Sequence, residues 1–396
     1  MKTKIRRSQL LVIGCFFGFF LFCLVWGLAQ PDRPSSAAEN RSLAQRPAMR
    51  RVVTDFGGFA KDFESYAADQ FPDREQLIGV YTALELAQGK KFARKAYCLQ
   101  GGWLLTKPTP TKPADLSALQ QALAQAGALD RPLVWCVLPL KNEALYDLEP
   151  AYFSDETGET NKQALTAALA QVEGLTVIDA EAPLVTGTLA DREQYFYKTD
   201  FHWNARGAFA AAQEIARQLA GAGTIAETSV PQAEDFLWSE LGGERRYQGD
   251  LNVWFSNQFS MQEDIPRYVP KNAADLRYFL HPGDNESVPR ETIVGSGLDE
   301  HPLTYNDVFT YNLGYYRVEN PDAPEAASVL ILKDSFQNAT IDYLSAIFRS
   351  VTVVDPRSYQ ETPDLASLLD ADGIDLVLFF YHQNNVSREL IDFLSA

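Results

Sequence analysis

The sequence predicts an α/β fold in which a doubly wound parallel sheet follows an N-terminal membrane-spanning helix. Short apolar runs alternate with longer helix-like segments beyond Pro113, which is the pattern of strands and crossover helices in a parallel sheet. The alternation stops near residue 221 and returns near residue 324, so we expect an inserted cap segment between them. An apolar run close to the N-terminus is long enough to cross a bilayer.

The N-terminus has the pattern of a membrane anchor. Residues 1–9 contain four basic side chains and no acid, and residues 10–29 are uncharged and mostly apolar. Basic residues before such a run keep the N-terminus in the cytoplasm. We therefore predict a signal anchor or transmembrane helix over residues 1–30, which places the chain in the cell membrane as a single-pass protein with an extracytoplasmic domain. Small residues at 27–29 also suit a signal peptidase, so cleavage is the alternative.

The exported part divides into a linker and a domain. Residues 31–51 are rich in Pro, Ser, Ala and charge without periodicity, which is typical of a linker. Residues 52–396 are predicted to form one domain, large enough to bury a sizeable core. The net charge of −17 argues against nucleic acid as a partner and against peripheral adhesion to anionic lipids. No Cys-x-x-Cys or His-Glu-x-x-His spacing occurs, and we expect no cofactor.

Each element of the domain is predicted from apolar periodicity. Two helices are expected at 55–68 and 74–88, followed at 99–105 by a hairpin or strand that enters the main sheet. The later strands are predicted at 133–138, 176–178, 329–332, 351–354 and 376–380. The helices between them are predicted at 116–126, 142–148, 161–171, 205–220, 337–349 and 363–369, with a short final helix. Residues 221–324, with many aromatic residues and turn formers, are predicted to form a loop-rich or β-rich cap.

Two short segments carry the chemistry of a serine hydrolase. Asp200 and His202 stand in an Asp-x-His arrangement, in which the carboxylate orients one imidazole nitrogen and leaves the other free as a base. Ser335 follows a predicted strand and precedes a predicted helix, at the edge of a parallel sheet where nucleophiles are presented. His202 lies just before the helix 205–220, whose dipole disfavours imidazolium. Asp200, His202 and Ser335 together predict a catalytic triad.

Simpler interpretations of these residues stay open. An Asp-x-His segment can be a surface turn or hold a structural histidine, and a serine after a strand can be a helix N-cap. A metal ion on Asp200 and His202 is a weaker alternative, and we assign no metal to the site.

Further residues of the site are harder to choose. The Ser335 backbone N–H is one candidate donor to an oxyanion. Asn338, in the first turn after the serine, and Asn384 or Asn385, after the strand 376–380, could supply another. The cap aromatics, Trp238 and Trp254 among them, are either packing or a sugar-stacking wall above the site.

Both motif segments resemble the DHHW and AlgX/AlgJ-type proteins. Asp200-Phe201-His202-Trp203 is similar to the Asp-x-His-Trp signature of that family, with Phe201 where the family name has its first histidine, and Asp334-Ser335-Phe336 is similar to its nucleophile segment. Other matching fragments, in chain order, are DQFPDR at 69–74, GGWL at 101–104, PLK at 139–141 and GDL at 249–251. The resemblance implies an SGNH-hydrolase-like (flavodoxin-like) sheet. Because the triad runs Asp, His, Ser, whereas in ordinary SGNH hydrolases the serine comes first, it implies a circularly permuted version.

The resemblance also implies a function. It predicts an O-acetyltransferase that modifies an exported or cell-surface polysaccharide through an acyl-serine intermediate, and that receives acetyl groups from a membrane-bound MBOAT-type acyltransferase. An acetyl esterase with the same triad is the first alternative. The second is a non-catalytic glycan-binding or assembly protein in which the motif is vestigial.

Overall fold

The computed structural model describes residues 7–36, 41–93, 96–149, 156–241, 246–297, 302–359 and 364–395. The chain forms two compact units, each described here by itself. The N-terminal unit comprises Met1–Ala93 with Val253–Gln258, and the α/β unit comprises Arg94–Asn252 with Phe259–Ala396. The proposed domain boundary near residue 52 stays a prediction.

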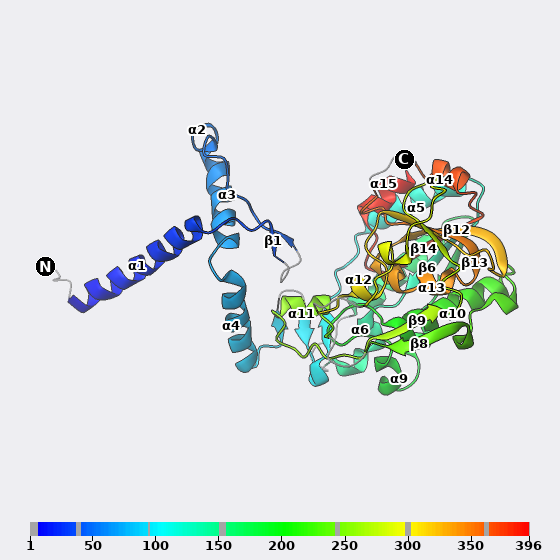
Figure 1. Ribbon diagram of the computed structural model, residues 1–396, viewed down its shortest axis with the longest axis horizontal. Helices are drawn as coiled ribbons and strands as arrows, with labels where there is room; N and C mark the ends of the chain where they lie inside the picture. Colours follow the sequence, from blue (N-terminus) through cyan, green and yellow to red (C-terminus); the bar gives the residue numbers. More distant parts are fainter. Residues whose placement is uncertain are drawn as a thin grey trace. The chain divides into compact units, whose positions relative to one another are not determined.

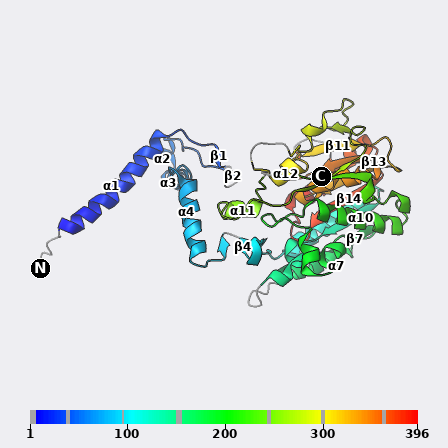
Figure 2. The same cartoon turned by 60° about the horizontal axis from the view of Figure 1, so that its bottom comes forward.

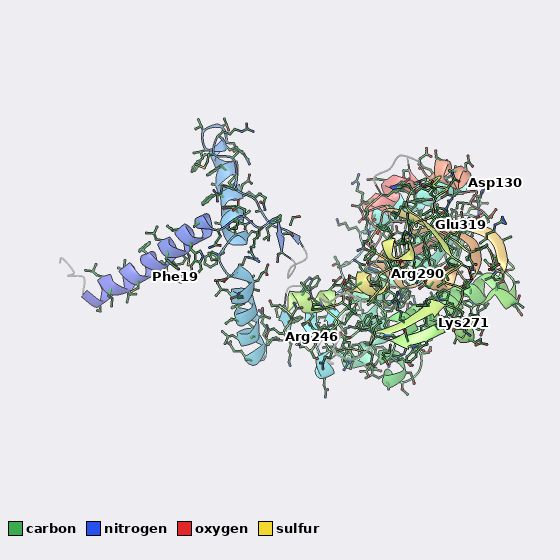
Figure 3. The ribbon with its side chains drawn as sticks, viewed as in Figure 1. Phe19, Asp130, Arg246, Lys271, Arg290 and Glu319 are labelled. Carbon is green, nitrogen blue, oxygen red and sulfur yellow. The ribbon has the colours of Figure 1, made fainter. Side chains whose placement is uncertain are left out.

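The N-terminal unit is built from helices. Its elements are α1 (Arg7–Ala29), β1 (Ser35–Ser36), β2 (Arg41–Ser42), α2 (Arg51–Thr54), α3 (Phe56–Asp69), α4 (Arg74–Ala87) and β3 (Phe92–Ala93). Within α1, Leu10–Gly27 has a mean hydropathy of 2.5 and is 6% buried, so α1 is a candidate membrane span by length and composition. Phe19, labelled in Figure 3, is 60% exposed on this helix.

Part of the predicted linker is hydrogen-bonded to α3 and the residue after it. The Gln70 side chain accepts from the Arg33 N–H at 3.0 Å and donates to the Ala44 carbonyl at 3.0 Å. The Tyr66 hydroxyl donates to Asp32 at 2.7 Å. These bonds explain why a stretch without apolar periodicity still takes a defined path.

A seven-stranded, mostly parallel sheet forms the centre of the α/β unit and confirms the predicted fold class. The strand order is β10-β11-β13-β12-β14-β6-β7, in which β13, β12, β14, β6 and β7 are parallel and β10 and β11 are antiparallel. Figure 2 shows β11 and β13 toward one end of this unit and β7 toward the other. The strands are β6 (Leu133–Leu138), β7 (Leu175–Asp179), β10 (Arg277–Phe279), β11 (Tyr315–Glu319), β12 (Glu325–Lys333), β13 (Phe348–Val354) and β14 (Leu376–His382).

Helices cover both faces of the sheet, which explains the continuous apolar strands. Leu330 and Leu332 of β12 pack on one face, and Val329 and Ile331 pack on the other. The first face is covered by α5 (Pro113–Gly127), α7 (Thr157–Leu169), α14 (Leu365–Ala371) and α15 (Arg388–Leu394). The second is covered by α10 (Ala205–Gly221) and α13 (Ile341–Leu344), and Figure 1 shows α5, α14 and α15 on the opposite side of the sheet from α10.

The predicted cap contributes more to the sheet than expected. Its residues form the antiparallel pair β8 (Phe236–Glu240) and β9 (Pro266–Pro270), but β10 and β11 extend the main sheet beyond β13. Conversely, the predicted hairpin at 99–105 does not enter the main sheet, because β5 (Leu104–Thr106) pairs with β4 (Ala96–Cys98) instead.

Two predicted helices are shorter than expected. Residues 337–349 contain most of the 3₁₀ turn η6 (Ser335–Ala339) and the single turn α13, because β13 already begins at Phe348. Residues 142–148 divide between α6 (Lys141–Ala144) and η2 (Tyr146–Leu148). The remaining elements of the unit are η1 (Gln100–Gly102), α8 (Ala182–Val185), α9 (Leu189–Glu193), η3 (Glu227–Ser229), η4 (Ala233–Asp235), η5 (Arg290–Thr292) and α12 (Tyr305–Val308). α11 (Asp250–Trp254) begins in this unit and ends in the segment of the other.

Candidate active site

Ser335 lies directly beyond the C-terminal end of β12, at the start of η6. Asp334 caps this turn, since its Oδ1 accepts the Phe336 N–H at 3.0 Å. Its Oδ2 accepts the His382 N–H at 3.1 Å and the Asn385 side-chain amide at 3.2 Å, both from the end of the neighbouring strand β14. The serine is therefore held on a short, capped turn at the edge of the sheet where ligands and nucleophiles of α/β folds gather.

The segment that carries His202 is fixed by the cap of α10. The Asn204 side chain accepts the N–H groups of Arg206 and Gly207 at 2.9 and 3.3 Å, as an N-cap residue does. Trp203 is fully buried, and its indole N–H donates to the Phe336 carbonyl at 3.0 Å. This bond ties the histidine segment directly to the serine turn.

The three residues predicted as a triad come together in one hydrogen-bonded line. His202 Nε2 lies 2.8 Å from Ser335 Oγ, and His202 Nδ1 lies 2.7 Å from Asp200 Oδ1. Asp200 is fully buried and His202 is 2% exposed. Because the ionised carboxylate can only accept, we assign the imidazole proton to Nδ1, which leaves Nε2 to accept the serine hydroxyl proton.

Four hydrogen bonds converge on the Asp200 carboxylate. Besides the His202 ring, Oδ1 accepts the His202 N–H at 3.0 Å, and Oδ2 accepts the Tyr247 hydroxyl at 3.0 Å and the Asp250 N–H at 3.1 Å. Burial acts to raise the pKa of Asp200, but the charge of His202 and these donors outweigh it and keep the pKa below its usual range. Asp200 is thus an ionised partner for the imidazole.

The neighbouring Asp250 behaves in the opposite way. Burial, and next the charge of Asp200, raise the pKa of Asp250 to about 6. Two carboxylates therefore lie close together in environments that separate their pKa values, which is a common property of catalytic sites.

Aromatic rings fix the plane of the His202 imidazole. Tyr305 stacks on one side with a centroid distance of 3.9 Å and an interplanar angle of 7°. Phe201 lies 3.9 Å from the ring centroid at an angle of 33°, and Phe336 lies 5.0 Å away. Phe201, the residue that departs from the family name, is therefore one of the rings that pack on the base.

The three asparagines proposed as oxyanion donors have partners within the protein. The Asn338 side chain accepts from Lys333 and donates to Asn306 and Asn312 at 3.3 and 3.0 Å. The Asn385 side-chain amide donates to Asp334 at 3.2 Å, and the Asn384 side chain accepts from Asn161 with its oxygen, which leaves the Asn384 amide N–H groups as candidate donors. The Ser335 N–H, by contrast, has no acceptor among the described residues, so it stays the first candidate donor.

The two tryptophans proposed as an acceptor surface lie in different units. Trp238, on β8, is 50% exposed, and its ring centroid lies 5.8 Å from the Arg206 guanidinium carbon. Trp254 belongs to Val253–Gln258 in the N-terminal unit. The structure thus leaves the role of either ring in acceptor binding a prediction.

Asp200, His202 and Asp250 also offer ligand atoms within 4.8 Å of one another. Nδ1 of His202 and both oxygens of Asp200 already hold hydrogen bonds, so an ion at this cluster would have to replace them. The donor set fits the hydrogen-bonded line better than a metal centre, which needs those same lone pairs.

Several residues of the site were missed by sequence reasoning. Tyr247 and Tyr305 come from the predicted cap, and Lys141 from the turn after β6. The GDL and PLK fragments flagged two of these regions, since Tyr247 precedes Gly249 and Lys141 closes the second fragment. Nothing marks Tyr305 in the sequence.

Comparison with known proteins confirms the resemblance. Residues 103–276, less than half of the chain, match the family model of the SGNH hydrolase-like domain of acetyltransferase AlgX. The structure of Bacillus cereus PatB1 with a sulfonyl adduct is 21% identical with a TM-score of 0.64, covering 75% of this chain and 97% of that one. A DHHW family protein from Eubacterium siraeum is 17% identical with a TM-score of 0.55, covering 76% and 94%. No curated protein sequence matches the chain. At these identities the two structures share the fold.

Proposed function

We propose that this chain is an extracytoplasmic O-acetyltransferase that acetylates an exported or cell-surface polysaccharide through an acetyl-Ser335 intermediate. The observation that carries the proposal is the hydrogen-bonded line from Asp200 through His202 to Ser335 at the sheet edge. The match of residues 103–276 to the AlgX acetyltransferase domain supports acetyl transfer as the reaction and a polysaccharide as the acceptor.

In the first half-reaction, Ser335 Oγ attacks the carbonyl carbon of an acetyl ester or thioester while His202 Nε2 takes the hydroxyl proton. The 2.8 Å contact between these atoms gives the proton its path, and Asp200 stabilises the imidazolium that forms. The carbonyl electron pair moves to oxygen, where the Ser335 N–H is placed to donate. Collapse of this intermediate breaks the bond to the leaving group, which departs with the proton from His202. Acetyl-Ser335 remains.

The second half-reaction repeats the proton transfer with a sugar hydroxyl. His202, again neutral, takes the hydroxyl proton as the sugar oxygen attacks acetyl-Ser335. The tetrahedral intermediate then expels Ser335 Oγ, which regains a proton from His202. The products are an O-acetylated sugar and the free enzyme. Water in place of the sugar would make the same site an acetyl esterase.

The membrane helix and the donor complete the proposal. An anchor over residues 10–29 holds the domain outside the cytoplasmic membrane. The domain there has no access to the acetyl-coenzyme A of the cytoplasm. We propose a membrane-bound MBOAT-type acyltransferase as the partner that delivers the acetyl group.

The test uses nucleophile variants and a covalent label. Ser335→Ala and the double variant Ser335→Ala/His202→Ala are expected to lose nearly the same activity toward a chromogenic acetyl ester, because members of a triad act as a unit. A sulfonyl fluoride should label Ser335 in mass spectra. Ser387→Ala is the matched control, since Ser387 only caps α15 by accepting the Leu390 N–H at 3.2 Å. Full activity or labelling in the Ser335→Ala protein would rule out this serine as nucleophile.

Acceptor experiments separate transferase from esterase. Cell-surface oligosaccharides are expected to divert acetyl groups from water to sugar. A sugar hydroxyl that is bound in position reacts as if its concentration were far higher than in solution, so it can compete with water. Trp238→Ala and Trp254→Ala, tested separately because the two rings belong to different units, are each expected to lower transfer more than hydrolysis. Steady hydrolysis with no acetylated sugar in product mass spectra supports the esterase instead.

A further inference from the structure

Lys141 is a buried cation whose ammonium group is used entirely on backbone carbonyls. Its side chain is 2% exposed, and Nζ donates to the carbonyl oxygens of Leu104 at 2.7 Å, Lys198 at 2.9 Å and Asp200 at 2.7 Å. The Trp103 ring centroid lies 5.1 Å from the same nitrogen. An ammonium group has three donors, so all of them are satisfied, two on the segment that carries Asp200 and one on β5.

Glu263 binds the N–H groups of the same segment. Its carboxylate accepts the N–H of Lys198, the N–H of Thr199 at 3.0 Å and the Thr199 hydroxyl. The carbonyls of residues 198 and 200 thus face a cation, while the N–H groups of residues 198 and 199 face an anion. Charge-assisted bonds of this kind are shorter and stronger than neutral ones.

The remaining carbonyl of the segment is also occupied. Thr199 O accepts the N–H groups of Leu251 and Asn252 at 3.1 and 3.2 Å. The backbone that carries Asp200 is therefore fixed on several sides before its carboxylate meets His202.

We propose that Lys141 and Glu263 are positioning residues for the triad acid, which clamp the backbone of residues 198–200 so that Asp200 Oδ1 stays in line with His202 Nδ1. The inference rests on the proposed function of the triad, and neither residue touches a reacting atom. A buried charge is costly unless it is paired and hydrogen-bonded. An apolar residue at position 141 would avoid that cost, but it would take the donor from the Leu104 and Asp200 carbonyls and leave Lys198 O with the Leu104 N–H at 2.9 Å alone.

The clamp should respond to pH. Burial lowers the pKa of Lys141 to about 7, against the charges of Glu263 and Asp200, which act to raise it. Three charged or polar features face the Lys141 ammonium group: the two acids, the Trp103 ring, and the Lys198 ammonium, which lies 5.7 Å from the centroid of that ring. A neutral amine has one donor fewer, so turnover should fall as the pH rises through the pKa of Lys141. Arginine stays protonated over this range.

The experiment compares Lys141→Met, Lys141→Arg and the control Lys162→Met. Lys162 pairs with Glu181 and Asp179, away from the triad. Lys141→Met is expected to lower kcat about 100-fold, the scale of a 1 Å misplacement of a catalytic group, with KM little changed. Lys141→Arg should recover part of kcat and lose the decline on the alkaline side. Lys162→Met should keep both the rate and the pH profile.

A nuclear magnetic resonance measurement tests the positioning of Asp200 without measuring turnover. The His202 Nδ1 proton, bonded to Asp200 at 2.7 Å, should give a low-field signal that Lys141→Met shifts and Lys162→Met leaves in place. If Lys141→Met does not fold, Glu263→Gln is the milder variant, with an expected loss of about tenfold, the scale of one charge-assisted hydrogen bond. A folded Lys141→Met or Glu263→Gln protein with unchanged signal, kcat and pH profile would overturn the clamp. An inactive wild-type protein that shows the signal and its shift would instead refute the proposed function alone.

Discussion

Replacing Gly249 by alanine is expected to disable the triad without removing any of its members. A Cβ at this position would lie 2.2 Å from the Thr199 oxygen and 2.6 Å from the Asp200 nitrogen, whereas Cβ atoms essentially never approach other heavy atoms within 3.0 Å. The backbone at residue 249 and the backbone at Thr199 must therefore separate by about 0.8 Å, which is the difference between the 3.0 Å limit and the 2.2 Å contact. Because both contacts are backbone atoms of the segment that carries Asp200, the displacement moves the acid away from His202.

The magnitude follows from that displacement. A misplacement near 1 Å costs about 100-fold in rate, while overpacking costs about 1–3 kcal/mol of stability, so the Gly249→Ala protein should stay folded with kcat reduced about 100-fold. The assay is burst and steady-state hydrolysis of a chromogenic acetyl ester, with thermal unfolding measured alongside. Gly221→Ala is the matched control, since a Cβ there meets nothing within 4 Å. A Gly249→Ala protein within threefold of the wild-type kcat would refute the reasoning.

Three further predictions concern pH, core and topology. Because the pKa of Asp250 is raised from 3.8 to about 6, the folded state keeps a proton that the unfolded chain releases. The free energy of unfolding should then fall by at most about 3 kcal/mol as the pH rises from 3.8 to about 6. Urea titrations should show that Asp250→Asn makes the free energy of unfolding less dependent on pH. An Asp250→Asn protein with the same pH dependence as the wild type would contradict the prediction. Phe379→Ala should cost about 3–5 kcal/mol in urea unfolding, since Phe379 is fully buried and stacks on Trp135 at 5.2 Å. Leu237→Ala, at a 58% exposed position, should cost under about 0.5 kcal/mol. Protease added to intact spheroplasts should digest the chain beyond residue 52, and full protection would reverse the topology.

The interior strands could be predicted because both of their faces are buried. β6, β12 and β14 are continuous apolar runs packed between two layers of helices, and such runs stand out in a sequence. β10 and β11 could not be predicted, since they are short and mix apolar with charged residues at the sheet edge. β11 is placed by pairing with β13, and β10 by pairing with β11; contacts between distant segments of this kind leave no local pattern.

The same distinction holds at the site. Asp200, His202 and Ser335 stand in short motifs, so their meeting could be foreseen from chemistry. Tyr247 reaches Asp200 from a segment 47 positions away, and a single tyrosine among many carries no signal of that bond. Likewise, no sequence pattern indicates that the buried Lys333 ammonium donates to the amide oxygen of Asn338.

The order of strands also determines when the proposed triad can first assemble. β14, the last strand among the described residues, lies between β12 and β6. Until it inserts, the sheet consists of two halves, one that ends in the serine turn and one that begins with β6 and leads to the Asp200 segment. A chain that is made from its N-terminus therefore carries Asp200 and His202 long before Ser335 can meet them. Under the proposed function, a nascent or truncated chain that lacks β14 should therefore be inactive, because assembly of the triad depends on one late, long-range pairing.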